Sequence, residues 1–258
     1  MHCLKGDTEL NKTIHTILNH KSIRKFKNVP LTNKEIEVLV KSAQAASTSS
    51  YNQPYSIIGV TDYNKKQKIE EIAFNHSFVS QSGYLFIFCI DWYRHKQLAE
   101  TRKVNILKSI ENTESFMTSL IDAALAAQNL TIAAESLGLG ICYLGGIRNN
   151  LEEIDKIVST PNYVIPIFGI VVGVPDQTRE LKPRLPIKNI FHVNRYIDDL
   201  DFNIKYLNEY DNITKDYYAN RKENKRKDYW SQKILRNLKE NDRHYMTKYV
   251  KRKKLNRE

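Results

Sequence analysis

The stretch DAALAAQNLTIAAESLGLGICYLGGIRNN, residues 122–150, decides most of the fold prediction. Its first half is rich in alanine, which favours helix more than any other residue, so we predict a helix over Met117–Leu137. Alanine is also small enough to let another backbone approach closely. The helix therefore belongs in the core, in a subunit interface, or with one face in each. Gly138 predicts a left-handed helix cap, and ICYLGG predicts a strand that runs into a glycine turn.

Outward from this stretch, the chain mixes helices and strands. Thr32 followed by Glu35 is the signature of a capping box and predicts a helix that runs to about Ala46. Apolar spacing predicts further helices at residues 10–18, 65–72, 95–110 and 151–158. Runs of β-branched or other apolar residues predict strands at residues 56–61, 84–91 and 163–175. These elements lack regular βαβ alternation, so the predicted fold class is α+β.

The character of the chain changes near residue 200. Residues 1–200 hold the predicted strands and most predicted helices, and they form one predicted domain. Residues 201–258 are polar and rich in tyrosine and lysine, with intermittent helical spacing and no core of their own. Helices with little apolar surface are marginal in water, so this C-terminal extension must pack on the main body or on another subunit.

The composition is basic, with 40 Lys and Arg against 29 Asp and Glu and a formal net charge of +11. A positive surface steers phosphates, nucleic acids and acidic membranes towards itself. A composition biased towards lysine explains the same excess without any partner. The basic C-terminus KYVKRKKLNRE lacks an aromatic-interleaved recognition motif, which disfavours nucleic acid as the partner.

The sequence also predicts a soluble cytoplasmic protein. It contains no run of about 20 apolar residues of the kind that spans a membrane, and its first residues lack the apolar segment of a secretory signal. Cys3, Cys89 and Cys142 have neither disulfide-framework nor metal-ligand spacing, so we expect reduced, structural thiols and no metal.

Two basic segments are candidates for binding a phosphate. The loop His20-Lys21-Ser22-Ile23-Arg24 brings cationic and hydroxyl donors together, and Pro183 holds Lys182 and Arg184 in fixed relation. Either segment is equally well interpreted, by itself, as a solvated basic loop.

Two further segments could contact a flat or polar ligand. The run Ser47–Ser50 offers hydroxyls and backbone amides, and Gly145 with Gly146 would let a ring approach the backbone, although both patterns also occur in ordinary turns. The GLG within SLGLGICYLGG is not a dinucleotide fingerprint, because a helix precedes it and a strand follows. Motifs of metal hydrolases, serine hydrolases, P-loop proteins and EF-hands are absent from the sequence.

Taken in order, these segments resemble the oxygen-insensitive NADPH nitroreductases and NADPH-flavin oxidoreductases of bacteria. The resemblance rests on HKSIRKF (20–26), AASTSSYNQP and SII (45–58), the alanine-rich stretch above, and LKPRLP (181–186). It spans nearly the whole chain, and the combination is more specific than any single motif.

The resemblance implies an α+β fold with a mixed, largely antiparallel sheet flanked by helices, and a homodimer that binds FMN at its interface. FMN contacts are implied for His20, Ser22, Arg24, Thr48, Ser50, His76, Leu144, Gly145, Gly146, Lys182 and Arg184. The phosphate would contact His20, Lys182 and Arg184, with help from Ser22. Arg24 would lie near the pyrimidine edge, where a cation stabilises reduced flavin. His76 stands where family members often have Gln.

The resemblance further implies that Arg221 and Arg226, in ANRKENKRKDYW, bind the extra phosphate of NADPH, and that Arg243 lines the substrate pocket. The predicted reaction is ping-pong transfer from NADPH through FMN to a small-molecule acceptor such as a nitroaromatic, a quinone or free flavin, without a catalytic side chain. The alternatives are a flavin or disulfide reductase with another physiological acceptor, and a basic nucleic-acid-binding protein.

Overall fold

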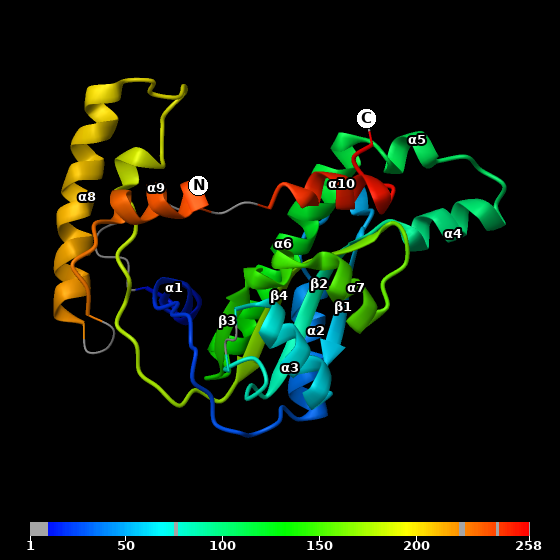
Figure 1. Ribbon diagram of the computed structural model, residues 1–258, viewed down its shortest axis with the longest axis horizontal. Coiled ribbons are helices and arrows are strands. Elements are labelled where there is room, and N and C mark those ends of the chain that lie inside the picture. The colour runs from blue at the N-terminus through cyan, green and yellow to red at the C-terminus, as the bar shows by residue number, and fades with distance from the viewer. Residues whose placement is uncertain (1–9, 75–76, 222–224, 241–242, 258) are drawn as a thin grey trace. The chain divides into compact units, whose positions relative to one another are not determined.

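A four-stranded antiparallel sheet forms the centre of the larger of two compact units (Figure 1). Its strands are β1 (Tyr55–Val60), β2 (Tyr84–Asp91), β3 (Gly140–Leu144) and β4 (Val164–Gly173), in the order β1-β2-β4-β3. Adjacent strands pair antiparallel throughout. The α+β class and the largely antiparallel sheet are therefore confirmed.

The computed structural model describes residues 10–74, 77–221, 225–240 and 243–257. The first unit comprises Met1–Arg179 and Arg243–Glu258, and the second comprises Glu180–Asp242.

Strand β2 is apolar from Leu85 to Ile90 because both faces of the sheet are covered. Phe86, Phe88 and Ile90 join one buried cluster, whereas Leu85 and Ile87 join the cluster on the other face. Side chains alternate across a strand, so a strand buried on both sides needs apolar residues at every position.

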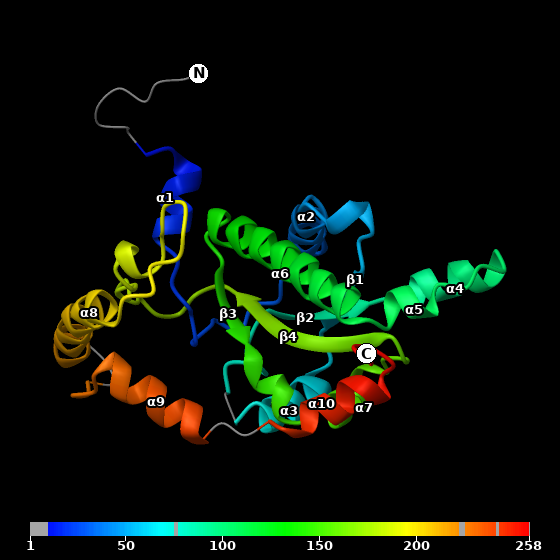
Figure 2. The ribbon, with the colours of Figure 1, turned by 90° about the horizontal axis from the view of Figure 1, so that it is seen from above.

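Figure 2 shows helices on the two faces of this sheet. Helix α6 (Thr113–Ser136) crosses one face beside α2 (Asn33–Gln44), and α3 (Tyr63–Ile72) and α7 (Leu151–Val158) cover the other. Both hydrogen bonds of the predicted capping box, between Thr32 and Glu35, are present at the start of α2. The alanine-rich helix is also confirmed, and its N-cap Asn112 starts it before the predicted residue.

The predicted helix over residues 95–110 is wrong as a single element. The chain forms α4 (Tyr93–Thr101) and then, after a break, the short α5 (Leu107–Ile110). Lys103, between them, has a left-handed backbone with φ of 56°. A single left-handed residue ends a right-handed helix, so the charged helical pattern cannot continue across it.

The remaining elements of the first unit are α1 (Lys12–Leu18), the short 3-10 helices η1 (Ser49–Tyr51) and η2 (Gly145–Asn149), and α10 (Tyr245–Arg252). Helix α10 is tied to α7, since the hydroxyl of Tyr249 donates to Asp155 at 2.8 Å. Gly138, directly after α6, has φ of 77°, as its predicted role of left-handed cap requires.

The second unit contains η3 (Ile187–Asn189), α8 (Leu200–Asn220) and α9 (Trp230–Glu240). Residues before 200 belong to it, because the Tyr210 hydroxyl donates to the Pro183 carbonyl at 2.9 Å. The ring of Tyr210 also packs edge-on against Trp230, with 5.5 Å between centroids. This division differs from the predicted boundary at residue 200, and α10 returns to the first unit.

Candidate functional site

The predicted phosphate loop lies between α1 and the first residues of β3. The Nδ1 atom of His20 is 2.7 Å from a carboxylate oxygen of Glu135, which lies near the end of α6. This hydrogen bond fixes the imidazole ring and leaves Nε2 as the nitrogen available to a ligand. Glu135 was not predicted, because nothing in the sequence links residues 115 positions apart.

Ser22 and Arg24 are held beside β3 by backbone pairing. Ser22 forms a parallel bridge with Ile141, and the N–H of Ile23 donates to the Ile141 carbonyl at 2.8 Å. Along extended backbone Ser22 and Arg24 point away from the side on which Ile23 is buried. Burial raises the pKa of the Cys142 thiol on β3, and the positive charge of Arg24 partly offsets that rise. Arg24 is therefore close enough to β3 to act electrostatically on Cys142.

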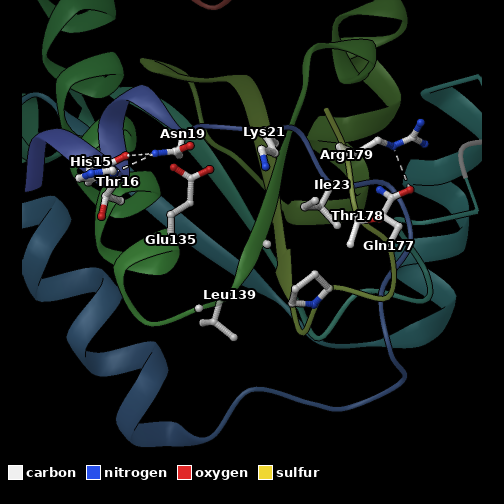
Figure 3. A pocket seen from close by; sticks show the side chains of 13 residues that line it. His15, Thr16, Asn19, Lys21, Ile23, Glu135, Leu139, Gln177, Thr178 and Arg179 are labelled. Atoms are coloured by element: carbon white, nitrogen blue, oxygen red, sulfur yellow. Dashed lines mark hydrogen bonds between the residues drawn. The ribbon is translucent and has the colours of Figure 1, made fainter. Parts of the chain in front are cut away.

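A pocket of about 500 Å³ opens on the other side of this loop (Figure 3). Lys21 and Ile23 line it, together with Glu135, Pro175 and the segment Gln177–Arg179. Ser22 and Arg24 are not among its lining residues. The pocket therefore lies on the opposite side of the loop from Ser22 and Arg24, and it is lined by Glu135, the partner of His20.

The predicted glycine turn follows the end of β3. Leu144 is buried, and Gly145 and Gly146 begin η2. A Cβ on Gly146 would lie 2.9 Å from the Cα and Cβ of Ala73, so close packing against the end of α3 requires this glycine. A Cβ on Gly145 would instead meet the guanidinium of Arg148 at 3.0 Å.

Arg148 is a half-buried cation that the sequence prediction missed. Its Nη1 donates to the carbonyl of Ile167 at 2.6 Å. Ile167 is the extra residue of a β-bulge, because Phe88 and Cys89 of β2 pair with Phe168 and Pro166 on either side of it. The carbonyl of Ile167 comes to lie next to the glycine turn only when the sheet has folded.

Arg243 comes to the same turn from the C-terminal segment. Its Nε and Nη2 donate to the side-chain oxygen of Asn149 at 3.1 and 2.8 Å. Burial lowers the pKa of Arg148, and the positive charge of nearby Arg243 lowers it further, because like charges repel. A pair of interacting cations beside Gly145 is suited to hold an anionic group of a ligand.

The polar loop with Thr48 and Ser50 is held by α6. The backbone N–H of Ser49 donates to both carboxylate oxygens of Asp122, at 3.0 and 3.2 Å, and Asp122 is 1% exposed. Ser50, Tyr51 and Gln53 have positive φ of 49°, 57° and 52°. Such backbone is unfavourable for residues other than glycine and is concentrated at functional sites.

The other predicted cations, Lys182, Arg184, Arg221 and Arg226, all belong to the second unit. The guanidinium of Arg184 donates to the carbonyl of Lys182 at 3.1 Å, and both residues line a pocket of about 360 Å³ with Tyr210 and Trp230. Lys182, Arg221 and Arg226 surround the ring of Tyr218. His76 lies outside the described residues, and its flavin contact stays a prediction.

Comparison with known proteins agrees with this arrangement. Residues 17–174 match the Nitroreductase family, and residues 182–258 match the Nitroreductase family, C-terminal domain. A Bacillus subtilis (strain 168) protein named FMN reductase (NADPH) is 52% identical over 248 residues, covering 96% of this chain and 100% of the relative.

Two solved structures are also similar. The NfrA1 nitroreductase from B. subtilis has a TM-score of 0.93 and 52% identity, over 95% of this chain and 100% of that one. The NADPH:FMN oxidoreductase from Vibrio harveyi complexed with NAD+ has a TM-score of 0.84 and 34% identity, over 96% of this chain and 100% of that one. The chain belongs to the nitroreductase family.

Proposed function

We propose that this protein is an FMN-dependent oxidoreductase that takes hydride from NADPH and passes the electrons to a nitroaromatic, a quinone or free flavin. One observation carries the proposal: β3 has the donor loop His20–Arg24 beside its first residues and the glycine turn at its end. Ile141 and Leu144 are three residues apart, or about 10 Å along a strand. An elongated ligand with a phosphate at one end and a flat ring at the other suits that spacing.

The residues around β3 suit FMN chemically. His20 and Ser22 offer a ring nitrogen and a hydroxyl, and Arg24 adds a cation, which together suit a phosphate dianion and the electron-rich edge of a flavin. Gly145 leaves the adjoining backbone open, where a side chain would meet Arg148. Lys182 and Arg184 are proposed to complete the phosphate contacts, and Thr48 and Ser50 to contact the ring or the ribityl chain.

FMN, when bound, supplies the redox chemistry, accepting hydride at N5 and returning electrons to a second substrate. The protein's part is to bind, orient and stabilise charge. Arg24 would favour the anionic reduced form, and Arg148 with Arg243 would hold an anionic group of NADPH or of the acceptor next to Gly145. NADPH and the acceptor would bind in turn at the same site, which predicts ping-pong kinetics.

The test is the visible spectrum of the purified protein, recorded without oxygen before and after NADPH is added. Flavin bands that bleach with NADPH, together with parallel double-reciprocal lines for NADPH and acceptor, are the expected result. A colourless protein that cannot be reconstituted with FMN would contradict the proposal, and intersecting lines would contradict the ping-pong order.

We also propose that a second copy of the chain covers the outer face of α6. Met117, Ile121 and Leu125 are 52%, 53% and 44% exposed, and a spacing of four residues places them on one stripe of the helix. The opposite face is buried against the sheet through Ala123 and Ala127. The helix thus has a core face and an uncovered apolar face, as expected of an interface helix.

None of the helices in the described parts of the chain is long and apolar enough to cross a membrane. Cytoplasmic residence stays a proposal, supported by the buried free thiols of Cys89 and Cys142, which suit a reducing compartment.

A further inference from the structure

The pocket beside the loop His20–Arg24 is built by four segments of the first unit. It has a volume of about 500 Å³ and is lined by the end of α1, by the loop itself, by the turn after α6 and by the segment after β4. Figure 3 shows Glu135 on the side of α1, Gln177 and Arg179 on the opposite side, and Lys21 between them. The pocket lies at the C-terminal end of α6, away from the residues proposed for the dimer.

Lys21 supplies a cation to this pocket that no acid compensates. The residue is half-buried, and it forms neither a hydrogen bond nor an ion pair with any of the described residues. Lys25 of the same loop is more exposed and does have a partner, because its Nζ lies 3.4 Å from a carboxylate oxygen of Asp176. An ammonium group that has lost part of its water is stabilised by an anion that replaces it.

Gln177 adds a second donor without an acceptor. Its side-chain oxygen accepts a hydrogen bond from Nε of Arg179 at 3.1 Å, which fixes the orientation of the amide. The Nε2 atom of the same amide is buried and has no hydrogen-bond partner among the described residues. A buried donor without a partner is costly, so an acceptor on a bound molecule would be stabilising here.

Glu135 supplies the opposite charge. One of its oxygens is 2.7 Å from Nδ1 of His20, whereas the other accepts no hydrogen bond from the described residues, and its side chain is 13% exposed. Glu135 and Lys21 line one pocket without forming an ion pair with each other. Opposite charges that share a cavity but do not meet leave room for a molecule that carries both charges.

We propose that this pocket binds a small zwitterion with an apolar side group, of which an α-amino acid is the simplest. The ammonium group of the ligand donates to Glu135, and its carboxylate accepts from Lys21 and Gln177. The side group packs on the apolar residues of the wall, which are Ile23, Leu139 and Pro175. The inference goes beyond the proposed function, because it involves neither flavin nor NADPH.

The experiment measures binding by calorimetry to the full chain as purified, with three ligands that share one aromatic side group. L-Phenylalanine carries both charges, 3-phenylpropionate lacks the ammonium group, and 2-phenylethylamine lacks the carboxylate. L-Phenylalanine should bind at least about tenfold more tightly than either of the others, because each lost charge removes a charge-assisted hydrogen bond. No binding of L-phenylalanine, or equal affinity for all three ligands, would overturn the proposal.

Two variants assign the two ends of the ligand. Lys21→Met should weaken L-phenylalanine by about tenfold and leave 2-phenylethylamine unchanged, whereas Glu135→Gln should weaken L-phenylalanine and leave 3-phenylpropionate unchanged. Lys25→Met is the matched control, because it makes the same change in the same loop outside the pocket.

Equal loss in Lys21→Met and Lys25→Met, or a loss in either pocket variant that is the same for all three ligands, would overturn the proposal. If Glu135→Gln does not fold, the comparison of Lys21→Met with Lys25→Met decides. These measurements need no reduction of flavin, so their outcome is independent of whether NADPH bleaches the flavin bands.

Discussion

At the scale of single residues, Asp122 illustrates a conflict between burial and function. Burial raises its pKa, and the hydrogen bond from Ser49 opposes that rise. A carboxyl group whose pKa is higher in the folded state stabilises the fold at low pH, and that contribution is lost as the pH rises through the folded pKa. At neutral pH the charge of Asp122 therefore destabilises the fold, although its oxygens hold the loop with Thr48 and Ser50.

We expect Asp122→Asn to raise the melting temperature at neutral pH, because the amide removes the buried charge and keeps an acceptor for Ser49. The gain should shrink as the pH falls through the pKa of Asp122. Asp122→Ala leaves the Ser49 N–H without this acceptor and should lose about 1–3 kcal/mol. Thermal unfolding over a pH series measures both, with Asp62→Asn on the exposed start of α3 as control. A lower melting temperature for the asparagine variant at neutral pH would contradict this account.

At the scale of elements, η2 follows β3 directly in the chain, and the two together position the candidate site. The strand fixes the donor loop through Ile141, and the turn after it places Gly145 next to Arg148. The two glycines of the turn have different reasons to be there. Gly146 packs against the backbone of Ala73, whereas Gly145 faces the movable end of a side chain.

The two glycines should therefore respond differently to alanine. Gly146→Ala forces backbone apart and should cost about 1–3 kcal/mol in the free energy of unfolding. Gly145→Ala displaces only the end of Arg148, so its stability should stay near that of the wild type while flavin affinity and reductase activity fall. Urea denaturation of the flavin-free proteins and FMN titration measure the two effects. Equal losses of stability would show that the turn is purely structural.

At the scale of the whole molecule, the exposed apolar stripe on α6 supports the proposed dimer. Ile121→Glu places a charge in the middle of that stripe and should convert the proposed dimer into a monomer with weakened FMN binding. Leu98→Glu, on the 59% exposed Leu98 of α4, makes the same chemical change elsewhere and should leave the assembly intact. Sedimentation equilibrium of both variants measures the outcome. A monomeric wild type would contradict the dimer.

The sequence by itself determined the elements whose signals are local. The capping box at Thr32, the alanine-rich α6, the left-handed Gly138 and the apolar strand Tyr84–Asp91 all formed where they were predicted. Caps, helix propensity and strand patterns depend on neighbours within a few residues, so they can be read without the fold. The break at Lys103 was missed, because a charged stretch gives no strong signal for a left-handed residue.

The tertiary structure alone decided which side chains support the candidate site. His20 meets Glu135, Ser49 meets Asp122, Arg148 meets the carbonyl of Ile167, and Arg243 meets Asn149. In the second unit Tyr218 gathers cations from three segments. These partners are distant in sequence, and their pairing depends on strand order, a β-bulge and helix packing. Sequence periodicity carries no record of such pairings, because they are fixed only when separate elements close on one another.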